Sequence, residues 1–383
     1  MENILKWLKR IAPFLGLSIL YYSLVLLVVI LFNYYNPNSL ALAQRINPFY
    51  LLLRWDSFHY LDIVLKGYTG ELVFFPLYPI IVSGFSIFFS CIFSGFLVSF
   101  FSLTAALYYL NKLISRDNGQ EIAHRSILLM LFFPTAMFLP LIYTESLFLA
   151  LVAAFFYYAN KKQWLTAVII GFFATLTRNV GIFLWPVYLV YILMNFYSSG
   201  YKKFYEQIIN LIKKKEFWYS LIIPAGLFLY CLYTYLQFGD FFAFISGQKN
   251  WAQFHTFMWP GETFYNFGKI IFKNSNGQIN SYNFSRIVFI EGGSFLLLLI
   301  TTIYWIIKKH WPYALLCLLN TLLFSCMFPM TSVNRYVVVI FPIFIFLAHV
   351  TKKFDWLFYS TLALLFVLFI FNIYQFSTGI WVA

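Results

Sequence analysis

"IAPFLGLSILYYSLVLLVVILF", residues 11–32, is an unbroken run of apolar and small uncharged residues. An α-helix rises about 1.5 Å per residue, so a run of this length covers the roughly 30 Å of hydrocarbon in a bilayer. Similar runs recur along the 383-residue chain, which is 62% hydrophobic and only 10% charged. A single water-soluble core could not bury so much apolar surface. The sequence therefore predicts an all-α polytopic membrane protein, since the alternating segments of a β-barrel are absent from it.

The same run bears on processing of the chain. It follows a basic flank containing Lys6, Lys9 and Arg10, as the apolar core of a signal peptide does. It continues to Phe32, however, without a cleavage site made of small residues. We expect an uncleaved first transmembrane helix.

Charge predicts the orientation of the helices. The net charge is +13, and the basic residues gather in short blocks between apolar segments. The blocks are Lys6/Lys9/Arg10, Lys112/Arg116/Arg125, Lys161/Lys162, Lys202/Lys203 with Lys213 to Lys215, Lys308/Lys309 and Lys352/Lys353. Such blocks mark the cytoplasmic side of a membrane protein. They do not form the continuous basic stripe of a nucleic-acid-binding protein, so no nucleic acid partner is expected.

With these blocks on the cytoplasmic side, ten apolar segments each cross the membrane once. They lie near 11–33, 126–142, 145–160, 164–178, 180–198, 217–238, 286–307, 311–328, 335–350 and 354–376. Of the two segments at 73–92 and 95–111, parity allows only one to cross. Pro79 and Gly84 interrupt the first, which we expect to lie in the membrane interface. The prediction is about 11 crossings in a single domain, 1–383, with a cytoplasmic N-terminus, an external C-terminus and large outer loops at 36–94 and 239–285.

The unusual polar residues all fall at the outer ends of the predicted helices. They occur in the stretches 54–71, 143–146, 177–179, 238–255 and 331–336. Ionisable groups near hydrocarbon are costly and usually have a function, so their collection on one face predicts an interfacial active site.

Each of these residues also has a purely structural interpretation. Asp56 could simply be the N-cap of a helix, since aspartate is common at that position. His59 comes three residues later, on the same helical face. Glu145 opens a helix, where a carboxylate interacts favourably with the helix dipole. Arg178 and Arg335 could extend toward lipid head groups. The functional interpretation depends on the fact that all these residues are predicted to lie on the same, outer side of the membrane.

The residue inventory limits the chemistry. The sequence contains no nucleotide-binding glycine loop, zinc-ligand spacing or GxSxG motif. Carboxylates and arginines remain. They suit a transfer reaction in which an acid deprotonates an acceptor hydroxyl while cations hold a phosphate.

Several stretches carry a family resemblance. In order they are "RWDSFHYLDIVLKGY", "FFPLYP", "FFPTAMFLPLIYTESLFLAL", "ATLTRNVGIFL", "GDFFAFISGQKNW" and "NRYVVVIFP". Over residues 50–350 the chain resembles the phosphatidylinositol-glycan class V (PIG-V) family, the second mannosyltransferase of GPI-anchor synthesis, and its prokaryotic relatives. The resemblance implies a GT-C-type fold with interfacial helices in the first outer loop. It also implies that the sugar donor is linked to a polyprenyl phosphate and that the sugar is transferred on the non-cytoplasmic face of the membrane.

The resemblance also implies roles for individual residues. Asp56 is the expected catalytic base of an inverting displacement. The expected substrate-binding residues are Trp55, His59, Tyr60, Glu145, Arg178, Asp240, Gln248, Trp251 and Arg335. The chain departs from the family where Asn179 replaces a frequent proline and where the segment after Gly239 reads "GDFFAF".

The leading hypothesis is a mannosyltransferase of the plasma (inner) membrane of a prokaryote. Its partners would be the lipid-linked donor, a lipid or glycan acceptor and membrane lipids. No cofactor or metal ion is required, although a divalent ion between Asp56 and Glu71 or Glu145 stays open. A transporter or flippase of a lipid-linked or anionic solute is the alternative, and a non-catalytic assembly factor is a third.

Overall fold

The computed structural model describes residues 2–35, 48–196, 209–250, 256–273, 286–328 and 332–382. The chain forms two compact units. The first unit comprises residues 1–157 and 344–383, and the second comprises residues 158–343. The expected outer loops, 36–94 and 239–285, lie partly outside the described residues.

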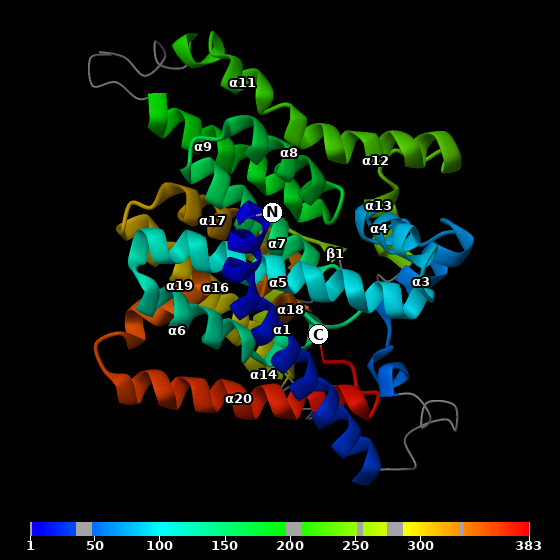
Figure 1. Ribbon diagram of the computed structural model, residues 1–383. Helices are drawn as coiled ribbons and strands as arrows, with labels where there is room; N and C mark the ends of the chain where they lie inside the picture. Colours follow the sequence, from blue (N-terminus) through cyan, green and yellow to red (C-terminus); the bar gives the residue numbers. More distant parts are fainter. Residues whose placement is uncertain are drawn as a thin grey trace. The chain divides into compact units, whose positions relative to one another are not determined.

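The first unit is built from helices (Figure 1). They are α1 (Glu2–Tyr35), η2 (Pro48–Leu52), α3 (Asp56–Lys66), α4 (Leu77–Ser86), α5 (Cys91–Asn118), α6 (Gln120–Leu131), η3 (Pro134–Phe138), α7 (Glu145–Asn160), α19 (Pro342–Thr351) and α20 (Asp355–Ser377). Helix α7 runs a few residues past the boundary of this unit, and α19 begins just before it.

The second unit is also mainly helical. Its elements are α8 (Trp164–Thr175), η4 (Asn179–Phe183), α9 (Leu184–Phe196), α11 (Lys215–Tyr219), α12 (Ile222–Phe238), α13 (Ala243–Ser246), η5 (Gly247–Asn250), β1 (Thr256–Phe257), α14 (Pro260–Lys273), η7 (Arg286–Glu291), α16 (Gly292–Ile307), α17 (Trp311–Ser325), β2 (Met327–Phe328) and α18 (Val333–Val337). The two short strands pair antiparallel, with Thr256 opposite Phe328.

The predicted class, an all-α membrane protein, is confirmed. Six segments of the described chain are long and apolar enough to cross a membrane: Lys9–Tyr34, Cys91–Asn118, Asn179–Phe196, Lys215–Phe238, Phe289–Ile307 and Asp355–Ser377. Five described apolar helices are shorter: Leu77–Ser86, Glu145–Asn160, Trp164–Thr175, Trp311–Ser325 and Pro342–Thr351. The count of eleven crossings and the single domain stay predictions.

Two of the predicted continuous segments are broken by proline. Within 126–142, α6 ends at Leu131 and Pro134 begins η3, with Phe133 extended at φ −61° and ψ 143°. Within 335–350, α18 ends at Val337 and α19 begins at Pro342. A proline disfavours helical geometry in the residue before it but suits the first turn of a new helix. Each of these two segments is therefore divided between two helical elements.

In the first unit, α1 crosses α20 (Figure 1), and α20 also contacts η3 and α6. Aromatic pairs join α1 to α20, with the ring centroids of Tyr21 and Phe369 5.9 Å apart and those of Phe32 and Tyr374 5.1 Å apart. Edge-to-face and tilted aromatic pairs add about 0.5–1.5 kcal/mol each to the burial of their area.

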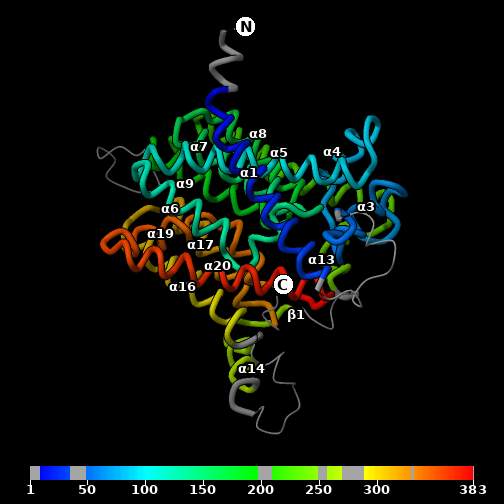
Figure 2. The backbone as a smooth tube through the Cα atoms, turned by 60° about the horizontal axis from the view of Figure 1, so that its bottom comes forward, coloured from blue at the N-terminus to red at the C-terminus, as the bar shows by residue number. Residues whose placement is uncertain are grey.

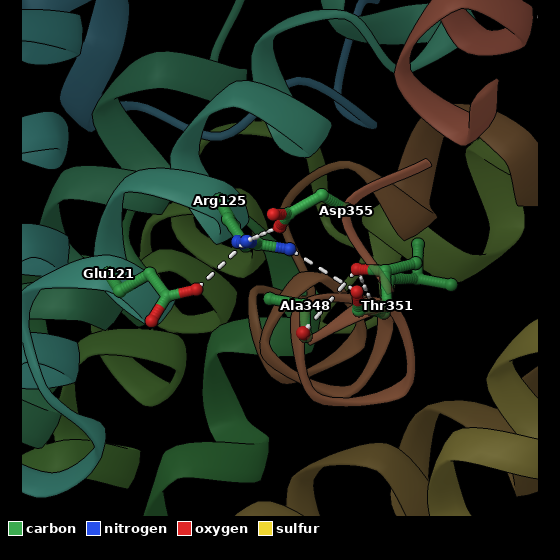
Figure 3. Close-up of polar contacts among 6 residues, drawn as sticks. Glu121, Arg125, Ala348, Thr351 and Asp355 are labelled. Atoms are coloured by element: carbon green, nitrogen blue, oxygen red, sulfur yellow. Dashed lines mark hydrogen bonds and ion pairs between the residues drawn. The ribbon is translucent and has the colours of Figure 1, made fainter. Parts of the chain in front are cut away.

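A polar cluster ties α6 to the junction of α19 and α20 (Figure 3). The guanidinium of Arg125 lies 2.9 Å from a carboxylate oxygen of Glu121 and pairs with Asp355. It also donates to the carbonyl oxygen of Thr351 at 3.2 Å. This arginine, expected only to mark the cytoplasmic side, is largely neutralised by two carboxylates.

In the second unit, α16 lies beside α17 (Figure 2), and α8 lies beside α12 (Figure 1). The approach of α8 and α12 requires a glycine, because a Cβ at Gly226 would lie 2.1 Å from Oγ1 of Thr175. The Thr175 hydroxyl bonds across this contact to the carbonyl oxygen of Ile223 at 3.1 Å. Small residues and interhelical hydrogen bonds of this kind are how membrane helices pack.

Candidate active site

The predicted base, Asp56, is the first residue of α3 and is partly buried. Trp55 occupies the N-cap position, and its side chain makes no capping hydrogen bond. The interpretation of Asp56 as an N-cap is therefore wrong. Asp56 instead lies in the first turn of α3, where a negatively charged side chain interacts favourably with the helix dipole.

The backbone just before Asp56 is strained. Trp55 has φ 42° and ψ −110°, a conformation that bulky L-residues rarely adopt. Ring contacts hold it there, since its centroid is 5.1 Å from that of Phe376 and 5.0 Å from that of Trp381. Strained residues of this kind persist only where their surroundings fix them, and they cluster at functional sites.

His59 and Tyr60 pack on the segment that contains "FFPLYP". The ring of His59 stacks on that of Phe74 at 5.1 Å, and the ring of Tyr60 meets those of Phe74 and Tyr78 edge-on. Helix α4 is in turn fixed to α5, because the Tyr78 hydroxyl bonds to the carbonyl oxygen of Gly95 at 3.0 Å. His59 and Tyr60 are thus held by a layer of aromatic contacts within the first unit.

Glu145 is the first residue of α7, as expected, and is fully buried. The two residues before it in the chain form hydrogen bonds with residues in and just before α3. The Tyr143 hydroxyl donates to the carbonyl oxygen of Arg54 at 3.0 Å, and the Tyr60 hydroxyl donates to Oγ1 of Thr144 at 3.4 Å. The structure therefore brings the residues around Asp56 and those around Glu145 together in the first unit.

Arg178 lies against a residue of α18, the short helix of the second unit that carries Arg335. Both arginines are almost fully buried, at 8% and 7% exposure. The guanidinium of Arg178 lies 4.6 Å from the ring centroid of Tyr336, the residue that follows Arg335 in α18. A cation over an aromatic face is stabilised by the ring quadrupole. Tyr336 was missed in the sequence, because nothing in its local pattern indicates a partner more than 150 residues away.

A second missed residue is Glu291, the last residue of η7, which is fully buried. Its carboxylate oxygens accept hydrogen bonds from the backbone N–H groups of Ser332 at 3.0 Å and Asn334 at 3.1 Å. Glu291 therefore holds the start of the short helix that carries Arg335. A lone acid within the apolar segment 286–307 was the available signal.

The remaining predicted contact residues come shortly before and after α13 in the sequence. One oxygen of Asp240 accepts from the backbone N–H of Phe242 at 2.9 Å, and the other accepts from the Ser246 hydroxyl. Asp240 thus closes its own turn. Gln248 lies partly exposed in η5, and Trp251 lies outside the described residues. Their roles in substrate binding stay predictions.

No group of three or more His, Cys, Asp or Glu residues that could hold a metal ion occurs among the residues that the structure describes. The charged groups at the predicted site are carboxylates and arginines. They could serve a reaction in which a proton is removed and negative charge develops on a phosphate.

The fold and these sites define an integral membrane protein of the all-α class with ionisable groups buried among its helices. No family model matches the chain. It is similar to GPI mannosyltransferase 2 of Schizosaccharomyces pombe, with 29% identity over 188 residues. The match covers 46% of this chain and 40% of that protein. The chain is thus distantly related to a mannosyltransferase. The match spans less than half of the length of that protein.

Proposed function

We propose that the chain is an integral-membrane glycosyltransferase, in particular a mannosyltransferase that uses a polyprenyl-phosphate-linked sugar. The similarity to GPI mannosyltransferase 2 is the observation that carries this proposal. The acceptor is a lipid or glycan hydroxyl on the non-cytoplasmic face. The membrane would be the plasma (inner) membrane if the source is prokaryotic.

In the proposed reaction Asp56 removes the proton of the acceptor hydroxyl. The acceptor oxygen attacks the anomeric carbon of the sugar, while the bond between that carbon and the phosphate oxygen breaks. The electron pair leaves with the polyprenyl phosphate, and the single displacement inverts the anomeric configuration. A positioned general base of this kind contributes about 10²–10⁴-fold to the rate.

Negative charge that develops on the leaving phosphate must be balanced. Arg178 and Arg335 are the groups we assign to the donor phosphate, because a guanidinium offers paired donors that match phosphate oxygens. Their burial supports this assignment, since a charge shielded from water interacts more strongly with a bound ion. Glu291 holds the backbone that carries Arg335.

The base is tested by replacing Asp56 with Asn. The purified protein is given polyprenyl-phosphate-[¹⁴C]mannose and a membrane extract as a source of acceptors, and labelled products are counted. The Asp56→Asn variant should lose about a hundredfold or more of kcat, because the amide cannot take the proton.

A matched control lies six residues away on the same helix. Asp62 is exposed and pairs with Lys66 at 2.9 Å, so Asp62→Asn removes the same charge without touching the proposed base. It should retain wild-type transfer. Full activity in Asp56→Asn would sink the assignment of the base, and no transfer by the wild type would sink the proposed activity.

A further inference from the structure

Arg54 is a cation that the predicted chemistry does not yet use. Its guanidinium donates one hydrogen bond, to the carbonyl oxygen of Ser377 at 3.2 Å. Its Nε atom is buried and has no hydrogen-bond partner within the described part of the chain. None of the ion pairs found among the described residues includes it.

Arg125 of the same unit shows how this protein satisfies an arginine that is only structural. That side chain is paired with Glu121 and Asp355 and also donates to a carbonyl oxygen (Figure 3). Among the described residues, Arg54 has one carbonyl partner and no carboxylate partner. Burial lowers the pKa of Arg54, as it does when nothing nearby compensates the charge.

An uncompensated, partly buried guanidinium with an unused donor destabilises a folded protein unless something binds it. A bound anion would supply both the missing charge and the missing acceptor. Phosphate fits best, because its oxygens match the fork of N–H groups on the guanidinium.

The position of Arg54 is fixed by its neighbours. Its carbonyl oxygen accepts the hydrogen bond from Tyr143, and the next residue, Trp55, is held between Phe376 and Trp381. Asp56, two positions after Arg54, is the first residue of α3. A ligand on Arg54 would therefore be bound by a residue only two positions before the one proposed to take the acceptor proton.

We propose that Arg54 binds a phosphate group of a lipid-linked substrate, carried either by the sugar donor or by the acceptor. This deepens the proposed function and depends on it for the identity of the substrate. The site is distinct in sequence from Arg178 and Arg335, and it needs no residue of the second unit.

Binding is tested without turnover by adding undecaprenyl phosphate, the probe, to the purified protein and measuring the thermal midpoint. The wild type should be stabilised by the probe. Arg54→Met should weaken the affinity about 10- to 100-fold, the effect of losing a charge-assisted hydrogen bond. Arg54→Lys keeps the positive charge but lacks the forked N–H groups of the guanidinium. Its affinity for the probe should lie between those of the wild type and Arg54→Met.

The same variants separate binding from a merely structural role. Without probe, Arg54→Met should have a midpoint equal to or above that of the wild type, because an uncompensated charge is removed. A structural arginine would give the opposite result. Arg125→Gln is the matched control: it should lower the midpoint and leave the affinity for the probe unchanged. An unaltered response to the probe in Arg54→Met, or no response in the wild type, would overturn the proposal.

Kinetics then distinguish the two sources of phosphate. A higher KM for polyprenyl-phosphate-mannose in Arg54→Lys assigns the site to the donor, and a higher KM for the extracted acceptor assigns it to the acceptor. If neither KM changes, the proposal is wrong. If the wild type binds the probe but transfers no sugar, the proposed function fails while the phosphate site stands.

Discussion

A carboxylate buried among apolar side chains is costly unless donors surround its oxygens, and Glu291 has found two in backbone amides. These amides belong to the turn that begins α18, where Ser332 adopts a left-handed conformation with φ 64°. The carboxylate therefore fixes a backbone conformation that would otherwise be unfavourable. Arg335 follows within one helical turn, so its position depends on Glu291.

Replacing Glu291 should affect stability and donor binding together. Glu291→Ala leaves two buried N–H groups without acceptors and should cost about 3 kcal/mol. Glu291→Gln keeps one acceptor oxygen and should cost less, while the KM for the donor rises several-fold because Arg335 is less well placed. Thermal midpoints and initial rates measured at varied donor concentrations test both expectations.

A suitable control for Glu291 lies on the next helix. The hydroxyl groups of Thr302 and Thr321 are 3.0 Å apart between α16 and α17, so Thr302→Val also removes a buried polar contact. It should lower the midpoint without changing the KM for the donor. If Thr302→Val and Glu291→Gln changed the KM for the donor by the same factor relative to the wild type, Glu291 would have only a structural role.

At the level of single residues, sequence reasoning found acids but not their partners. It correctly placed Glu145 at the start of a helix and predicted a helix beginning near Asp56. It failed for the cap of α3, because the position is taken by Trp55 in a conformation that no propensity favours. It also missed Glu291, because the partners of that residue are backbone amides, which every sequence contains.

The C-terminal end of α20 is the element that supports Asp56. Ser377 accepts from Arg54, and Phe376 and Trp381 enclose Trp55. The hydrogen bond from Arg54 satisfies one of the last carbonyl groups of α20. The end of α20 thereby holds the chain in the strained turn that precedes Asp56.

Removing part of this support should slow the reaction more than it weakens binding. Trp381→Ala frees one face of the Trp55 ring, so Asp56 should sample more positions. A fall in kcat of about tenfold is expected, since small displacements of a catalytic group reduce the rate strongly. The KM for the donor should change little.

The opposite end of the same helix provides the control for Trp381→Ala. Trp356 is 67% exposed near the start of α20, and Trp356→Ala removes an equal side chain. It should leave kcat unchanged. Equal losses in both variants would show that the effect arises from general destabilisation of α20.

Among the elements, helices were easier to predict than their ends. The apolar runs at 11–33 and 354–376 correspond to α1 and α20, because a long apolar run in a membrane protein has few alternatives to a helix. The breaks at Pro134 and Pro342 were overlooked although the prolines were visible. Proline is tolerated within membrane helices often enough that hydropathy alone does not locate a break.

For the whole molecule, the crossing count depends on helix α4. It has ten residues, which extend about 15 Å, half the thickness of the hydrocarbon. Its length supports the proposal that it lies in the interface. That proposal keeps the basic blocks on one side of the membrane.

Cysteine labelling tests this topology. In a variant with the four native cysteines replaced by serine, Thr69→Cys and Phe88→Cys place thiols at exposed positions before and after α4. Both should react with a membrane-impermeant maleimide in intact cells. Lys161→Cys, expected in the cytoplasm, should react only after permeabilisation. Protection of the cysteine at position 88 in intact cells would mean that α4 crosses and that the predicted parity is wrong.

The bond between Arg54 and Ser377 joins residues 323 positions apart in the sequence. A ribosome delivers the first of these residues to the membrane long before the second. The turn at Trp55 therefore cannot reach its final conformation until α20 has been made and inserted. Under the proposed function, a nascent chain interrupted before that point would carry Asp56 but would not yet hold it in place, so catalytic competence would arrive only with α20.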